Sequence, residues 1–364
     1  MATEITQLPI IELEGSPADM GEAYGEICLE DIHKLYDIRL RTAIVFAREA
    51  GRRFTEEQVL EVCRQCLPIT EEYDPVGYEE FCGVGRGSGL SPEQVYALNG
   101  FTDLRDILGY ADLPAGWGCS SLIIAPDRGE GSHSLLGQNW DLQTSNMEHV
   151  CLVHRRPNDS PETCSLTVTG ALSLIGINSE GICVGNTNLV TTDARIGVQY
   201  LSVLHRALNS RSFKDAVEAV TSAPRGGAHY YYVGGPNGEA AGIECTACSH
   251  VRFDVTSGTF THCNHMLDEG NQKLEVERPT GSTCHHQDRL SHLLASHEGT
   301  FSPDDLKTYF ADHEGGNDLA ICRHDDLNGA STNACVILSP QTRELHACRA
   351  QPHVGEWVKR IFNF

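Results

Sequence analysis

Cys119 is the residue of this 364-residue chain whose setting most favours nucleophilic chemistry. It follows Gly118 and precedes two serines and the apolar run at residues 122–124. A deprotonated thiol is a strong nucleophile, and a glycine before it leaves its own carbonyl sterically open. The Cys119 thiol could therefore attack the Gly118 carbonyl in an N-to-S acyl shift. Hydrolysis of the resulting thioester would leave Cys119 as a new amino terminus.

A free α-amino group would give Cys119 a base of its own. Such an amine has a reference pKa of roughly 7.7–8.0 and can take the thiol proton at neutral pH. One residue then supplies both nucleophile and base, so a distant catalytic histidine is not required. From these residues alone, a buried strand headed by a small residue is the alternative, because cysteine is common in protein cores.

Several sequence blocks follow one another along the chain. The first is Gly116-Trp117-Gly118-Cys119-Ser120-Ser121, and the second is Gly137-Gln138-Asn139-Trp140-Asp141. Further blocks lie at residues 176–181, 233–244, 261–265 and 320–323. In this order the blocks resemble the self-processing acyl-coenzyme A:6-aminopenicillanic acid acyltransferase family of the N-terminal nucleophile (Ntn) hydrolases. The resemblance covers nearly the whole chain from about Glu14 onward.

Helices and strands come in blocks rather than in strict alternation along the chain, which predicts an α+β fold with mainly antiparallel sheets. The resemblance implies the four-layer αββα sandwich of Ntn hydrolases. It also implies self-cleavage between Gly118 and Cys119. Residues 1–118 would be a helical N-terminal part that becomes the α subunit, and residues 119–364 would be the Ntn core that becomes the β subunit. The two would remain one integrated αβ heterodimer, and further oligomerisation stays open.

The resemblance also implies roles for other residues. Asn264 would donate to the oxyanion, and Asp141 would orient the Cys119 amine or hold a substrate ammonium. Asn139, Trp140 and Glu244 are expected to bind substrate. Without the resemblance, Asn264 would be interpreted as a turn asparagine at a strand end and Asp141 as an Asx turn.

The sequence departs from the family at one position. The family's acyltransferase has an arginine just before a late core strand, whereas this chain reads Leu327-Asn328-Gly329-Ala330-Ser331. Arg323, in the matching Ile-Cys-Arg block, is not assigned the role of that arginine. The sequence therefore does not predict penicillin as the substrate.

Charge and cysteine content exclude several other classes of protein. Fifty acidic residues against twenty-seven basic ones give a formal net charge of −23, which disfavours nucleic acid and anionic membrane surfaces as partners. The fifteen cysteines are spread through a long chain without a signal-like start, so we expect a reducing, cytoplasmic location. No apolar run is long enough to span a bilayer.

No metal and no cofactor are expected, with acyl-coenzyme A as a co-substrate only for a transferase. The alternative is a structural zinc ion bound by soft ligands, which four groups of residues could supply. These are Cys63 with Cys66, Cys245 with Cys248, residues 262–265 and residues 284–286. The two Cys-x-x-Cys pairs lie too far apart in sequence for a compact zinc knuckle.

Patterning predicts helices before Cys119 and strands after it. Ser16-Pro17, Thr55 and Ser91 are typical helix starts, with the first helix expected over residues 17–38. The glycine-rich stretch 83–89 is expected to be a loop between helices. Beyond residue 119, apolar runs separated by Gly and Asn turns predict antiparallel strands, including one at residues 319–322.

The sequence thus predicts a self-processing cysteine amidohydrolase or acyltransferase that acts on the amide bond of a small N-acylated amine or amino acid. Alternatives are an acyl-coenzyme A-dependent N-acyltransferase of the same family and a non-catalytic, zinc-stabilised binding protein.

Overall fold

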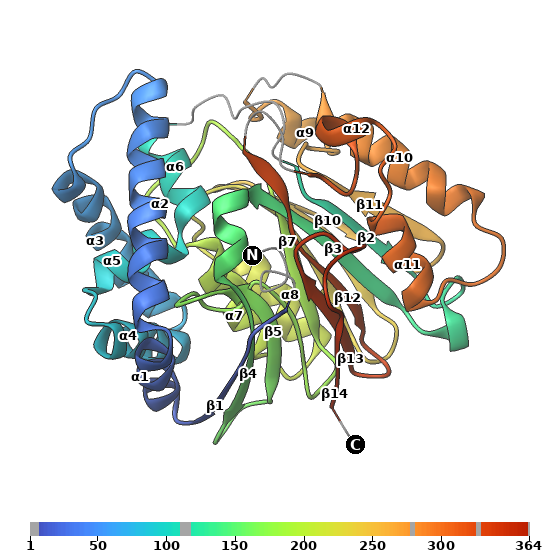
Figure 1. Cartoon of the computed structure of the whole chain (residues 1–364), viewed down its shortest axis with the longest axis horizontal. Helices are drawn as coiled ribbons and strands as arrows, with labels where there is room; N and C mark the ends of the chain where they lie inside the picture. The colour runs from blue at the N-terminus through green and yellow to red at the C-terminus, as the bar shows by residue number, and fades with distance from the viewer. Residues whose placement is uncertain (1–6, 110–117, 277–280, 325–328, 363–364) are drawn as a thin grey trace.

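Two β-sheets packed face to face occupy the centre of the molecule, and helices cover both outer sides (Figure 1). We describe the chain from a computed structural model, over residues 7–109, 118–276, 281–324 and 329–362. One sheet has eight strands in the order β1-β4-β5-β6-β7-β8-β9-β10, and the other has six in the order β11-β2-β3-β12-β13-β14. All pairings are antiparallel except that of β1 with β4.

The strands of the eight-stranded sheet are β1 (Ile10–Gly15), β4 (Val150–Pro157), β5 (Thr163–Val168), β6 (Ile175–Asn178), β7 (Cys183–Asn188), β8 (His229–Gly234), β9 (Ala240–Cys245) and β10 (His250–Asp254). Those of the six-stranded sheet are β2 (Ser120–Ile124), β3 (Leu135–Gln143), β11 (Thr259–His262), β12 (Ala330–Ser339), β13 (Glu344–Arg349) and β14 (Val358–Ile361).

The helices before the proposed cleavage site are α1 (Pro17–Ile27), α2 (Leu29–Glu49), α3 (Glu56–Tyr73), α4 (Pro75–Ser88), α5 (Pro92–Asn99) and α6 (Phe101–Gly109). Those after it are α7 (Tyr200–Leu208), α8 (Phe213–Ser222), α9 (Glu269–Gln272), α10 (Ser282–Ser296), α11 (Pro303–Phe310) and α12 (Gly316–Leu319). Among the described helices, none combines the length and the apolar character needed to cross a bilayer.

The layers follow from which faces are apolar. Helices α7 and α8 pack on the eight-stranded sheet, and α10 and α11 pack on the six-stranded sheet. Every residue of the central strands β2 and β12 is buried, as expected for strands covered on both faces. The predicted α+β class and αββα layering are confirmed.

Predicted helix starts are also confirmed where a side chain caps the backbone. The hydroxyl of Ser16 accepts from the amide of Asp19, and that of Thr55 accepts from the amide of Gln58. The first helix is shorter than predicted, however. It ends at Ile27, which is 61% exposed, and α2 starts at Leu29 after the single residue Cys28.

The glycine-rich stretch 83–89 is not a loop, and that prediction is wrong. Residues up to Ser88 belong to α4, which lies directly against α1. A Cβ atom on Gly83 would lie 2.5 Å from the carbonyl oxygen of Ala18, and one on Gly87 would lie 2.0 Å from that of Glu22. The glycines therefore permit close contact between two helix backbones.

Two further predictions need correction. The strand expected at residues 319–322 is absent from the described structure, where α12 ends at Leu319 and an irregular segment follows. The N-terminal part is also not purely helical. It contributes β1, which pairs in parallel with β4 of the core sheet.

Candidate active site

Cys119 lies immediately before β2, an interior strand of the six-stranded sheet. Strand β2 pairs with β3, which brings the Gly137–Asp141 block alongside it. The Cys119 thiol is 5% exposed, and its Sγ donates to the carbonyl oxygen of Asp141 at 3.7 Å. The sequence blocks around Cys119 and at residues 137–141 therefore meet at one place.

A small cavity of about 40 Å³ surrounds Cys119. Its lining combines residues from both sides of the proposed cleavage site: Phe101, Thr102, Arg105, Gly118, Cys119, Trp140, Asp141, Leu142, Asn186, Asn188, Tyr200, His229 and Asn264. Ligand pockets usually have volumes of about 300–1,000 Å³, so this cavity is far smaller than a typical ligand site. A substrate could enter only after the lining rearranges.

Asp141 is the carboxylate of this cavity. Burial raises its pKa to about 7, while the charge of Arg323 and a hydrogen bond from Thr332 act in the opposite direction. The Thr332 hydroxyl donates to Oδ1 of Asp141 at 2.7 Å. Oδ2 is buried and makes no hydrogen bond with the described residues. One carboxylate oxygen is therefore able to accept a proton.

The Cys119 thiol is held in its neutral form. Burial and the neighbouring Asp141 raise the pKa of the thiol to about 12, outweighing the hydrogen bonds that the thiol makes with the Asp141 backbone and the Gln138 side chain. In this environment the thiol must lose its proton to a base before or during nucleophilic attack.

Asn264 lies next to the proposed scissile bond. A Cβ atom built on Gly118 would be 3.4 Å from Oδ1 of Asn264. The amide nitrogen of the Asn264 side chain donates to the carbonyl oxygen of Asn188 at 2.6 Å, and its backbone amide donates to the Thr283 hydroxyl at 2.9 Å. Asn264 is thus fixed beside Gly118 by two neighbouring segments, with its side-chain oxygen nearest that residue and its side-chain nitrogen directed to Asn188.

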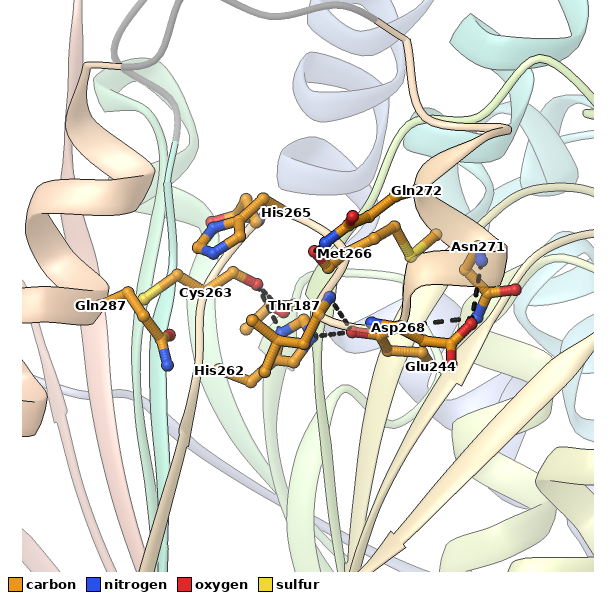
Figure 2. Close-up of polar contacts among 12 residues, drawn as sticks. Thr187, Glu244, His262, Cys263, His265, Met266, Asp268, Asn271, Gln272 and Gln287 are labelled. Carbon is orange, nitrogen blue, oxygen red and sulfur yellow. Dashed lines mark hydrogen bonds and ion pairs between the residues drawn. The ribbon is translucent and has the colours of Figure 1, made fainter.

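Glu244 lies outside the cavity and instead organises the loop that carries Asn264. Glu244 lies on β9 and is fully buried. Figure 2 shows its carboxylate facing His262 and Asp268. His262 Nε2 lies 2.9 Å from Oε1, and the Asp268 amide donates to Oε2 at 3.2 Å. Burial would raise the pKa of Glu244, but the hydrogen bonds from His262 and from the Leu267 and Asp268 amides lower it overall.

Asn139 and Trp140 lie on opposite sides of β3. Trp140 lines the cavity with Cys119. The Asn139 amide nitrogen donates to the carbonyl oxygens of Phe310 and Ile321, at 2.8 and 2.9 Å. Asn139 thus connects β3 to the end of α11 and to the segment before Arg323, away from the cavity.

His286 also lies at this site, although its place in the sequence suggested only a possible zinc ligand. Its Nδ1 lies 3.2 Å from the Ser120 hydroxyl and would be 3.6 Å from a Cβ atom on Gly118. Burial, together with the charge of Arg323, lowers the pKa of His286 to about 3, although hydrogen bonds to the Ala320 and Gly118 backbone oppose the shift. A neutral imidazole therefore lies beside the proposed scissile peptide.

The residues of the opposite cavity wall were also not predicted from the sequence. The rings of Tyr200 and His229 stack with centroids 4.5 Å apart, and His229 Nε2 lies 3.2 Å from Oδ1 of Asp103. Arg105, from α6, is 1% exposed and pairs with Asp106. Only the tertiary packing of α6, α7 and β8 around Cys119 brings these residues together.

The arginine expected before the late core strand has no counterpart in the described residues at that place. Leu327 and Asn328 lie outside the described residues, as do Gly116 and Trp117, while Gly329 and Ala330 lead into β12. Arg323 is fully buried, and its backbone amide donates to the Thr332 hydroxyl at 2.9 Å. The charge of Arg323 lowers the pKa of Asp141.

Comparison with known proteins identifies the family. The family model described as acyl-coenzyme A:6-aminopenicillanic acid acyl-transferase matches residues 128–353, more than half of the chain. The matched part contains Asp141 and Asn264 and begins after Cys119. The acyl-coenzyme A:6-aminopenicillanic-acid-acyltransferase 40 kDa form of Emericella nidulans is 26% identical over 318 residues, covering 86% of this chain and 84% of that protein.

Solved structures also show a partial likeness. The C2A mutant of conjugated bile acid hydrolase from Clostridium perfringens has a TM-score of 0.41 at 9% identity, covering 68% of this chain and 97% of that chain. Penicillin V acylase from Agrobacterium tumefaciens has a TM-score of 0.42 at 12% identity, covering 63% and 82%. These values are too low to carry an argument about the site. The extent of the family match shows that the chain belongs to the acyl-coenzyme A:6-aminopenicillanic acid acyl-transferase family.

Proposed function

We propose that the chain is a self-processing cysteine amidohydrolase that acts on a small N-acylated amine or amino acid through a Cys119 acyl-enzyme. One observation carries this proposal. Gly118 and Cys119 line one cavity together with a carboxylate, Asp141, and an amide side chain, Asn264. Nucleophile, proton acceptor and oxyanion donor are the three groups that acyl transfer requires.

Self-cleavage would begin with loss of the thiol proton to Asp141, whose Oδ2 can accept it. The Cys119 sulfur then forms a bond to the Gly118 carbonyl carbon, and the bond from that carbon to the Cys119 nitrogen breaks as the nitrogen takes up a proton. Water hydrolyses the thioester, which yields the Gly118 carboxylate and a free thiol. The neutral His286 imidazole would polarise the carbonyl during attack.

Turnover would use the amine that cleavage creates. The α-amino group of Cys119 takes the thiol proton, the sulfur attacks the substrate amide, and Asn264 stabilises the oxyanion. The amine leaves with that proton, and water hydrolyses the acyl-enzyme. Asp141 would hold the ammonium form of the terminal amine in place, because a nearby carboxylate stabilises that charge.

Cleavage also offers an explanation for the small cavity. The Gly118 carbonyl occupies the position beside Cys119 that a substrate carbonyl must take. After cleavage, the new Gly118 carboxyl terminus could leave Asn264 and His286. The acyl group of a substrate would then bind in the vacated space, with Trp140 and Tyr200 as apolar walls.

A second candidate is transfer of an acyl group from acyl-coenzyme A to an amine. The similarity to an acyltransferase over 86% of this chain favours it. Both reactions share the acyl-enzyme and differ in whether water or an amine accepts the acyl group. The acyl-coenzyme A would be a co-substrate, and no bound cofactor is proposed.

The test is a screen of processed protein against N-acyl amines and N-acyl amino acids, with and without an acyl-coenzyme A donor and a free amine. We expect release of the amine, loss of activity in Cys119→Ala, and a kcat lower by about 10²–10³-fold in Asn264→Ala. New amide formed only with the acyl-coenzyme A donor would favour the transferase. Full activity in mature Asn264→Ala would exclude its role at the oxyanion.

A further inference from the structure

A second cluster of reactive side chains lies outside the Cys119 cavity. It consists of His313, Cys322, His324 and His353, and the four potential ligand atoms all lie within 4.8 Å of one another. Nε2 of His313 is 2.9 Å from Nε2 of His324, and Sγ of Cys322 is 3.5 Å from Nδ1 of His353. We propose that these four residues form a structural Zn²⁺ site.

Two of the distances between donor atoms lie close to those around a tetrahedral zinc ion. Zinc binds imidazole nitrogen at roughly 2.0–2.1 Å and thiolate sulfur at roughly 2.3 Å, so tetrahedral ligands lie about 3.3–3.6 Å apart. The sulfur-to-nitrogen distance between Cys322 and His353 already has this value. The two imidazoles of His313 and His324 need to separate by less than about 0.5 Å.

The donor chemistry also favours zinc. One thiolate and three imidazoles form a mixed soft and borderline set, which suits zinc and disfavours magnesium or calcium. Four protein ligands complete a tetrahedral shell and leave no open position for a substrate. The site is therefore structural. It does not depend on the proposed amidohydrolase function.

The ligands come from three separate segments of the chain, each of which follows a helix or strand. His313 follows α11, Cys322 and His324 lie in the irregular segment after α12, and His353 follows β13. His313 and His353 are exposed, whereas Cys322 is buried. An ion could thus enter from the surface, and one ion would hold all three segments together.

The binding segment leads directly into the active site. Arg323 lies between two of the ligands, and its backbone amide donates to the Thr332 hydroxyl, which in turn donates to Asp141. Zinc would therefore fix the segment that carries Arg323. This placement gives a reason for a structural ion in this part of the molecule.

The cysteine pairs considered from the sequence are not part of this cluster. Cys63 and Cys66 are buried within the apolar core on α3, and Cys248 is exposed while Cys245 is buried. The four ligands proposed here are spread over 41 residues of sequence, from His313 to His353, with no short motif. Only the fold brings them together, so the sequence offered no signal for this site.

The first test measures zinc in the untagged full-length protein after loading with Zn²⁺ and removal of unbound metal by gel filtration. Inductively coupled plasma mass spectrometry should find about one equivalent per chain. Cys322→Ser and His353→Ala should each retain less than about a fifth of that amount. The matched controls Cys248→Ser and His292→Ala change exposed residues outside the cluster and should retain all of it.

A second measurement does not depend on the variants folding. Wild-type protein stripped with a chelator is titrated with Co²⁺, and a thiolate-to-cobalt charge-transfer band with tetrahedral visible bands should appear and saturate at about one equivalent. Zinc should abolish these bands. Failure of wild-type protein to bind either metal, or equal binding by ligand and control variants, would overturn the proposal. Cleavage after Gly118, measured on the same samples, reports separately on the proposed function.

Discussion

At the level of single residues, protonation states determine which reactions the Gly118–Cys119 junction can support. Near neutral pH the Cys119 thiol and the His286 imidazole are both neutral, because burial raises the pKa of the first to about 12 and lowers that of the second to about 3. Asp141, with a pKa raised to about 7, is the one of these three groups that changes charge in this range. Its ionisation should therefore control both stability and cleavage.

Replacing Asp141 with Asn should remove a pH-dependent loss of stability from the uncleaved protein. A raised folded-state pKa contributes stability that is present below the ordinary carboxyl pKa and is lost as pH rises through about 7. In a Cys119→Ala background, Asp141 should therefore lower the free energy of unfolding by about 2 kcal/mol between pH 5 and pH 8. Asp141→Asn in the same background should remove this decrease. Denaturant unfolding at both pH values measures this difference, and parallel pH profiles for the two proteins would contradict it.

Changing His286 to Gln should slow self-cleavage without unfolding the protein. The neutral imidazole lies beside the Gly118 peptide, so its loss should reduce the cleavage rate by about 10–100-fold. A time course of fragment formation during cell-free synthesis measures this rate. His292→Gln, an exposed residue of the same helix, is the control, and equal rates for both variants would remove His286 from the processing step.

At the level of elements, the sequence predicted those whose apolar periodicity and end signals agree. The strand after Cys119 and the helices capped by Ser16 and Thr55 are such cases. The helix α4 was missed because its glycines are typical of loops when considered alone. Their role depends on α1, which lies about sixty residues earlier and could not be placed against α4 from sequence.

Gly87→Ala should therefore destabilise the packing of α4 on α1, although alanine is the better helix former. A Cβ atom at this position would lie 2.0 Å from the Glu22 carbonyl oxygen, so one helix must move. We expect a loss of about 1–3 kcal/mol in the free energy of unfolding. Glu79→Ala, at an exposed position of the same helix, should change it by less than about 0.5 kcal/mol. Equal effects would contradict this explanation of the glycines.

The sequence predicted only those residues of the candidate site that lie in the matching sequence blocks. Cys119, Trp140, Asp141 and Asn264 line one cavity, although their catalytic roles stay predictions. The remaining walls come mainly from α6, β7, α7 and β8, whose residues have no shared motif. Glu244 and Asn139 were expected in the site because they lie in matching blocks, yet strand geometry directs their side chains to other partners.

At the level of the whole molecule, the two parts separated by the Gly118–Cys119 bond form one fold. Strand β1 extends the core sheet, and the buried ion pair between Glu80 and Arg155 joins the parts at 2.7 Å. The Tyr24 hydroxyl donates to the Val168 carbonyl at 3.0 Å. Cutting the chain at Gly118 leaves all of these contacts in place.

The cleaved protein should consequently remain a heterodimer. Residues 1–118 and 119–364 should elute together in gel filtration, at the volume of uncleaved Cys119→Ala, and should separate only in denaturant. Elution of the N-terminal fragment alone under native conditions would show that these contacts are too weak to hold the parts together.

The most direct test of the account is the intact mass of the purified wild-type protein, with amino-terminal sequencing of the larger fragment. We predict two fragments, the second beginning at Cys119, and one unbroken chain for Cys119→Ala. An active wild-type protein of a single uncleaved chain, or a cleaved one whose second fragment begins at another residue, would contradict the central claim.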